Sequence, residues 1–250
     1  MSDTPAILLP GAVLPADLAY AALLDELGRP LDVRAKDLEV YAQDEPPDDF
    51  SLETEVIGVL RFAGEAGFDR FNVVGYSAGG AVALALAATH PSRVGSLALM
   101  EPAWAGRHGM SAEEAAAHER VRAALAIEDP DAAMRAFVRA QLAADVPSPP
   151  SPSGPRPTWM AKRPAGVSAF VRAFDEADLS SEALSAFKGP VWFAVGGLSD
   201  PDLYARKAER LAAIWPRMIV QVFPERHHFD PPHRVEAGRV AAALRELWGR

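Results

Sequence analysis

The sequence predicts an α/β fold, in which a mostly parallel sheet carries helices on both faces and a helical segment is inserted part-way along the chain. Short apolar runs alternate with helical apolar spacing from residue 6 to about residue 104, and the alternation resumes after residue 188. Continuous apolar strands between helices are typical of parallel sheets that are covered on both faces. The 250 residues, 49% of them apolar, can form one such core.

The chain begins with the pattern of strand, loop and helix. Residues 6–9 are apolar throughout and are followed by Pro10 and Gly11, as expected for a buried strand. Helical apolar spacing follows over residues 16–28, and residues 33–40 carry a weaker strand pattern.

The next elements repeat this alternation. Ser51 resembles an N-cap ahead of a helix that reaches about Glu65. Residues 71–74 predict a strand, residues 78–89 a helix, and residues 94–100 another apolar strand.

After Trp104 the composition changes to Ala- and Glu-rich helical segments, over about residues 111–127 and 131–144, and then to the Pro-rich stretch 146–157. We interpret residues 105–187 as an inserted helical lid. The Pro-rich stretch fits a semi-rigid crossing between two lid helices better than a polyproline recognition segment.

Strand and helix alternate again in the last part of the chain. We expect strands at residues 191–195 and 218–223, and helices at residues 202–215 and 235–248. We therefore expect one α/β core formed by residues 1–104 and 188–250.

The composition argues against several classes of partner. The formal net charge is -9 and the pI is about 5.2, so the overall field repels nucleic acid and acidic membrane surfaces. The absence of cysteine excludes disulfides, thiolate metal sites and cysteine nucleophiles.

Residues 1–11 carry no basic run and no long apolar stretch, so we expect neither a signal peptide nor membrane insertion. The expected location is the cytoplasm. The oligomeric state has no sequence signal.

The strongest chemical signal is the segment Gly75-Tyr76-Ser77-Ala78-Gly79, between an apolar strand and a helix of small residues. To project a serine hydroxyl from a sheet, the backbone must turn sharply, and side chains beside it would collide with the neighbouring strand and helix. Ser77 is therefore the expected nucleophile. The alternative is a glycine-rich helix entry without chemistry.

A serine hydroxyl needs a general base, and the ordinary pKa of histidine suits that task. His227 and His228 follow the strand pattern of residues 218–223, where a loop can reach the sheet edge. The other histidines lie at helix ends or in the predicted lid: His90, His108, His118 and His233.

The third member of such a site is a carboxylate that fixes the histidine tautomer. Asp200 follows the strand pattern 191–195 in a short loop and is the favoured candidate, with helix N-capping as its structural alternative. Glu101 follows the strand that ends at Met100 and is the second candidate.

Three segments together resemble the α/β-hydrolase family: G-Y-S-A-G-G at 75–80, G-G-L-S-D at 196–200 and H-H at 227–228. The resemblance covers nearly the whole chain apart from the lid. It implies the chain order serine, acid, histidine, which Ser77, Asp200 and His228 satisfy. Because the family's base usually follows a glycine, the resemblance implies that His227 takes the glycine's place and His228 is the base. Glu101 resembles the acid position of some dehalogenases.

The resemblance also implies an oxyanion hole formed by the backbone N–H groups of Ala12 and Ala78. The sequence departs from the family at Pro10-Gly11, where relatives commonly carry His-Gly. Since the donor is a backbone amide, proline does not remove it. Proline at position 10 can still change the geometry of this loop, and the N–H of Val13 is the alternative second donor.

We therefore expect a carboxylic ester hydrolase that cleaves a small, mainly apolar ester or related acyl substrate through an acyl-enzyme. A carbon-carbon bond hydrolase with the same triad and a non-catalytic small-ligand receptor are the alternatives. No cofactor or metal is expected, because phosphate-loop endings and zinc-helix histidine spacing are absent. Six residues in or beside the lid are candidates to line the pocket: Trp104, Met110, Trp159, Met160, Phe170 and Phe174.

Overall fold

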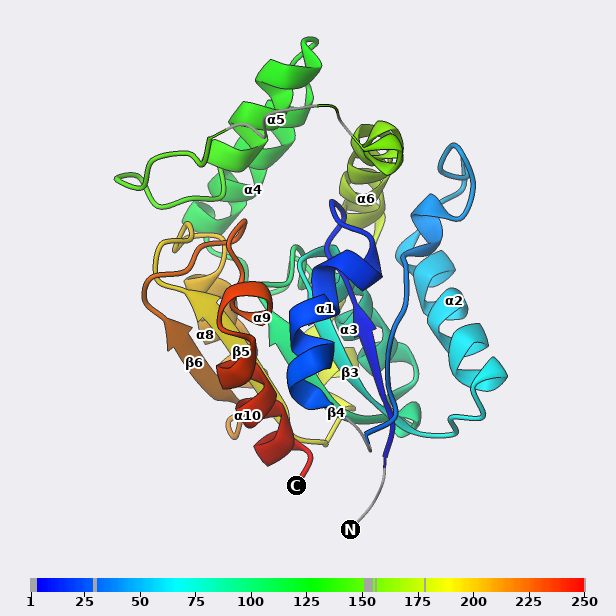
Figure 1. Cartoon of the computed structure of the whole chain (residues 1–250). Helices are drawn as coiled ribbons and strands as arrows, with labels where there is room; N and C mark the ends of the chain where they lie inside the picture. Colours follow the sequence, from blue (N-terminus) through cyan, green and yellow to red (C-terminus); the bar gives the residue numbers. More distant parts are fainter. Residues whose placement is uncertain (1–3, 29–30, 151–154, 156, 178, 250) are drawn as a thin grey trace.

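Six parallel strands form the central sheet of the computed structural model, which describes all residues except 1–3, 29–30, 151–154, 156, 178 and 250 (Figure 1). Their order in the sheet is β2-β1-β3-β4-β5-β6. The strands are β1 (Ala6–Leu9), β2 (Val33–Ala35), β3 (Phe71–Tyr76), β4 (Val94–Met100), β5 (Val191–Gly196) and β6 (Ile219–Phe223). The predicted parallel sheet is confirmed.

Helices cover both faces of this sheet, as the alternation predicted. One face carries α1 (Ala16–Leu27), α9 (Pro232–Val235) and α10 (Ala237–Leu247), and the other carries α2 (Leu52–Glu65), α3 (Ala78–Thr89) and α8 (Ala205–Ile214). Along β1, Ala6 and Leu8 pack on the α1 and α10 side, while Ile7 and Leu9 pack on the other side. Because both faces are buried, the strand is apolar throughout.

Strand β2 is shorter than the predicted range 33–40. The carboxylate of Glu55 accepts the backbone N–H groups of Glu39 and Val40, both at 2.9 Å, and these bonds turn the chain into the 3-10 helix η1 (Glu39–Tyr41). A buried carboxylate that binds backbone amides is a tertiary contact, which the local strand pattern of residues 33–40 does not contain.

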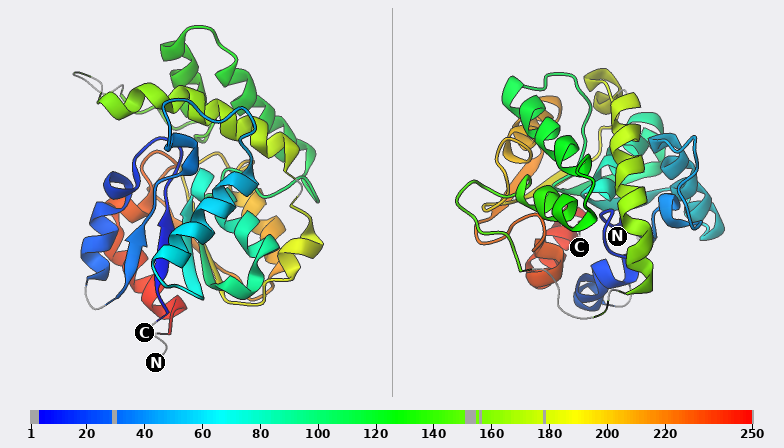
Figure 2. Two further views of the ribbon diagram at one scale, coloured as in Figure 1. Left: turned by 90° about the vertical axis from the view of Figure 1, so that its right-hand side faces the viewer. Right: turned by 90° about the horizontal axis from the view of Figure 1, so that it is seen from above.

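Helices α4 (Ala112–Leu125), α5 (Pro130–Arg139) and α6 (Arg163–Glu176) lie over the carboxyl ends of the strands (Figures 1 and 2), and η3 (Thr158–Lys162) leads into α6. We call α4, α5 and α6 the lid helices. Helix α7 (Ser181–Ser185) belongs to the predicted insertion but packs against α3 and α8. The limits 105–187 stay a prediction, and part of the Pro-rich stretch 146–157 lies outside the described residues.

The parallel sheet collects the candidate side chains at one edge, because all of its carboxyl ends point the same way. Ser77 directly follows β3 and Glu101 directly follows β4. Asp200 lies in the loop after β5, and His228 in the loop after β6.

Candidate active site

Ser77 lies in a strained turn between β3 and α3. Its φ is 53° and its ψ is -117°, a conformation that residues other than glycine rarely adopt. A Cβ atom at Gly75 would lie 2.5 Å from the carbonyl oxygen of Gly79, and one at Gly79 would lie 2.2 Å from that of Leu9. This close backbone packing explains glycine at both positions.

His228 lies between Ser77 and a carboxylate. Its Nε2 is 3.0 Å from Ser77 Oγ, and its Nδ1 is 2.9 Å from Oε2 of Glu101. Both Glu101 and His228 are buried. The backbone of Glu101 is left-handed, with φ 45°, and its Oε1 accepts the N–H of Gly196 at 2.7 Å. Both oxygens of this carboxylate are therefore held, one of them on the imidazole.

Asp200, the acid favoured from the sequence, makes different contacts. Its Oδ2 lies 2.9 Å from a guanidinium nitrogen of Arg120 on α4, and its Oδ1 accepts the N–H groups of Asp202 and Leu203 at 2.9 and 3.1 Å. Within the described residues no hydrogen bond joins Asp200 to His228. The expectation that Asp200 contacts His228 is therefore corrected. Glu101 contacts the imidazole, while Asp200 caps the turn before α8 and pairs with Arg120.

His227, the alternative base, does not contact the nucleophile in any hydrogen bond of the described residues. Its Nδ1 accepts the backbone N–H of Phe229 at 3.1 Å, and its half-buried position lowers its pKa. This local bond orients the His227 ring within its own loop, whereas His228 reaches Ser77.

Two tyrosine rings pack against the ring of His228, and the sequence analysis did not single them out. Tyr204 stacks on it, with centroids 4.7 Å apart and an angle of 13°, and the Tyr76 ring lies 5.1 Å away. Tyr76 donates its hydroxyl proton to the His228 carbonyl, and Tyr204 donates to Oε1 of Gln141 at 2.7 Å. Burial raises the pKa of both phenols, so they stay protonated donors. Tyr76 lies inside the serine motif, but Tyr204 has no local signal.

The two expected oxyanion donors lie beside the nucleophile. Ala12, Ser77 and Ala78 line one cavity together. As the first residue of α3, Ala78 has no acceptor for its N–H within the helix, and the helix dipole points its positive end here. Val13 is not among the residues that line this cavity.

The loop after β1 is fixed against the serine turn despite its proline. The carbonyl of Pro10 accepts the N–H of Gly79 at 3.0 Å, a contact that does not need an N–H at position 10. The carbonyl of Ala12 accepts the hydroxyl of Tyr41 at 2.5 Å. A Cβ atom at Gly11 would lie 2.8 Å from the Tyr76 ring.

The cavity in front of Ser77 lies between the sheet edge and the lid helices. Of the six proposed lining residues, Trp104, Phe170 and Phe174 line it. Trp159 lines a second cavity, and neither methionine lines either one. The wall is mainly apolar, but it also includes the charged Lys207, which sequence reasoning missed.

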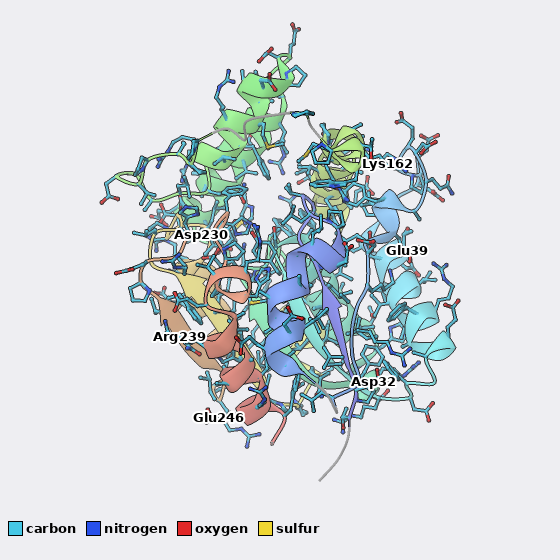
Figure 3. All side chains as sticks on the ribbon, in the orientation of Figure 1. Asp32, Glu39, Lys162, Asp230, Arg239 and Glu246 are labelled. Atoms are coloured by element: carbon cyan, nitrogen blue, oxygen red, sulfur yellow. The ribbon has the colours of Figure 1, made fainter. Side chains whose placement is uncertain are left out.

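The second cavity lies between α2 and the start of α6, where Figure 3 labels Glu39 and Lys162. Glu39 is paired with Lys36 at 2.7 Å and Arg61 at 2.8 Å, and these two cations lower its pKa against the opposing effect of burial. None of the candidate catalytic residues lines this cavity.

The described residues contain neither a cluster of metal-ligating side chains nor a helix that could span a membrane. No three His, Asp or Glu side chains gather in a group that could hold a metal ion in the part of the chain that the structure describes. In that same part, every helix is too short or too polar to cross a bilayer.

Comparison with known proteins adds the family. A family model described as alpha/beta hydrolase fold matches residues 59–230, and no curated protein matches. A hydrolase from Pseudomonas aeruginosa is similar at 20% identity and TM-score 0.73, over 100% of this chain and 92% of that one. A thermophilic esterase from Thermogutta terrifontis is similar at 19% and 0.69, over 97% and 88%.

An enol-lactonase from Burkholderia xenovorans is similar at 18% identity and TM-score 0.70, over 100% of this chain and 93% of that one. At such identities a structural likeness concerns the fold. The family model, however, spans more than half of the sequence and includes the serine turn. The chain therefore belongs to the alpha/beta hydrolase fold family.

Proposed function

We propose that this protein is a serine hydrolase that cleaves a small ester or related acyl substrate through an acyl-enzyme. Ser77 is the nucleophile, His228 the general base and Glu101 the acid. The observation that carries the proposal is the chain of two contacts, 3.0 Å from Ser77 Oγ to Nε2 and 2.9 Å from Nδ1 to Glu101. Membership of the family supports hydrolysis, and the esterase and lactonase named above suggest acyl substrates.

In the first step, Ser77 Oγ attacks the carbonyl carbon while its proton passes to Nε2 of His228. Glu101 keeps the Nδ1–H of the imidazole in place and stabilises the imidazolium that forms. The carbonyl electron pair moves onto oxygen, and the N–H groups of Ala12 and Ala78 bind that oxyanion.

When the tetrahedral intermediate collapses, the bond to the leaving alcohol breaks and Nε2 returns the proton to that alcohol. A water molecule then attacks the acyl-enzyme with the same base, and Ser77 is released with the free acid. The buried environment of His228 favours these proton transfers because few waters compete for its nitrogens.

The test combines covalent labelling with a panel of short chromogenic esters. We expect a fluorophosphonate probe to label the wild type and not Ser77→Ala, and the panel to show turnover that Ser77→Ala abolishes. Labelling that survives Ser77→Ala would contradict the assignment of the nucleophile. Tight ligand binding without turnover of any ester would favour a receptor instead.

A further inference from the structure

Lys207 is a buried cation beside the proposed site that the mechanism does not use. It is 0% exposed and lines the cavity in front of Ser77. Its Nζ donates to the carbonyls of Pro102 at 2.8 Å and Ala103 at 3.3 Å. An ammonium group has three N–H donors, so one remains for a further acceptor.

The anionic groups near Lys207 are already paired with other groups. Glu114 on α4 accepts two hydrogen bonds from Arg210, at 2.8 and 3.2 Å, and Glu101 binds His228. Within the described residues, no carboxylate lies in ion-pair distance of Lys207. Burial of an unpaired charge is costly, and burial lowers the pKa of Lys207 to about 7.

Further hydrogen-bonding groups without a partner lie next to this lysine. Nε1 of Trp104 and Nε2 of His118 are buried and make no hydrogen bond among the described residues, and the nearest carboxylate oxygen to Nε2 of His118, Oε1 of Glu114, is 4.0 Å away. Both side chains line the same cavity. Their rings are in contact, with centroids 5.2 Å apart. Burial, helped by Lys207 and nearby arginines, lowers the pKa of His118 to about 2, so its ring is neutral and carries one N–H donor.

The other charges at this end of the cavity cancel one another. Asp175 also lines the cavity, but it pairs with Arg107 at 2.9 Å and with Arg122, which binds Glu119 as well. Lys207 is therefore the one cation in the described wall of this cavity without an ion-pair partner, which suits a monoanion. The net charge of -9 does not prevent an anion from binding beside Lys207, because at physiological salt the electrostatic field of distant surface charges is screened over about 8 Å.

We propose that this end of the cavity binds a carboxylate carried by the acyl part of the substrate, so that the preferred substrates are short hemiesters rather than neutral esters. The inference rests on the proposed function. Lys207 lies close to the reacting centre: it binds the carbonyl of Ala103, whose N–H donates to the Ser77 carbonyl at 2.8 Å. The substrate carboxylate is therefore only a few bonds from the scissile carbonyl, in a cavity whose other walls are mainly apolar.

The test compares monomethyl succinate with methyl 4-methylpentanoate, a neutral ester of nearly the same shape, by titrating the acid released. We expect the wild type to favour the hemiester by at least about 10-fold in kcat/KM, the range of a hydrogen bond to a charged group. Lys207→Met should lower kcat/KM about 10- to 100-fold for the hemiester and less than about 3-fold for the neutral ester. Lys188→Met, at an exposed lysine, is the control and should change neither.

A second measurement uses only the wild type, in case Lys207→Met does not fold. The preference for the hemiester should fall as pH rises above about 7, since Lys207 then loses its proton. The groups that face Lys207 are Glu114 and His118 of α4, Arg210 of its own helix α8, Tyr204 at the start of that helix, and Glu101. Equal losses for both esters in Lys207→Met, or a wild type without preference, would overturn the inference while leaving ester hydrolysis intact. Absence of any turnover and of labelling would refute the proposed function itself.

Discussion

The loops after β4 and β5 each present a carboxylate at the same edge of the sheet, but the two carboxylates have different partners. Glu101 follows its strand directly, adopts a left-handed backbone and contacts the imidazole. Asp200 comes after a short loop and is held by two backbone amides and Arg120. A place at a strand end therefore does not by itself bring a carboxylate to the imidazole; backbone conformation and competing cations decide which of the two reaches His228.

The largest expected effect comes from removing the charge of Glu101. Glu101→Gln keeps the size of the side chain but cannot stabilise the imidazolium, and its amide can hold the wrong tautomer of His228. We expect kcat/KM on the best ester to fall about 10³- to 10⁴-fold, measured with folding verified by circular dichroism. Activity within about 10-fold of the wild type would show that Glu101 is not the acid.

The matched change in the other loop should affect stability more than activity. Asp200→Ala removes acceptors for two amides, so the free energy of unfolding should fall by about 1–2 kcal/mol in urea titrations. Asp200→Asn keeps an amide acceptor and loses only the pair with the half-exposed Arg120, so it should cost less than about 1 kcal/mol. Both variants should keep kcat/KM within about 10-fold of the wild type. A loss as large as that of Glu101→Gln would contradict the different roles of Glu101 and Asp200.

The sequence contained enough to predict the sheet, which is confirmed, and to propose Ser77 and His228 as candidates, which the structure brings within 3.0 Å of each other. Apolar strands and the glycine-flanked serine are local patterns that the parallel sheet then brings together. The choice between Asp200 and Glu101 was not local, because it depends on the left-handed φ of Glu101 and on Arg120 from a lid helix far along the chain.

Two further residues show the same limit of local patterns. Lys207 has the sequence context of an exposed helical lysine, yet in the fold it is completely buried against the cavity. Tyr204 directly precedes the same helix, α8, and stacks on the His228 ring only because the folded sheet brings the two segments together. Contacts between distant elements carry this information.

A smaller effect concerns a second buried histidine behind the site. His233 is packed between Tyr20 and Tyr76, and neither ring nitrogen has a hydrogen-bond partner among the described residues. Burial lowers its pKa to about 3. Because the unfolded chain binds the proton more readily, the wild type should lose stability as pH falls below about 6.5, by up to about 1.4 kcal/mol per pH unit for this group.

The variant His233→Leu tests this effect. It removes two unpartnered polar atoms, so it should flatten the decline in stability between pH 6 and pH 4, roughly the window between the unfolded and folded pKa values. His108→Leu, at an exposed position, is the control and should leave the slope unchanged. An unaltered slope in His233→Leu would mean that other groups cause the acid sensitivity.

The most direct measurement of the central claim is the second-order rate constant of fluorophosphonate labelling at Ser77, because it reports activation of the nucleophile whatever the natural substrate is. If Glu101 orients His228, Glu101→Gln should label at least about 100-fold more slowly than the wild type, and Asp200→Asn within about 3-fold of it. Unchanged labelling of Glu101→Gln, together with a collapse in Asp200→Asn, would contradict the account.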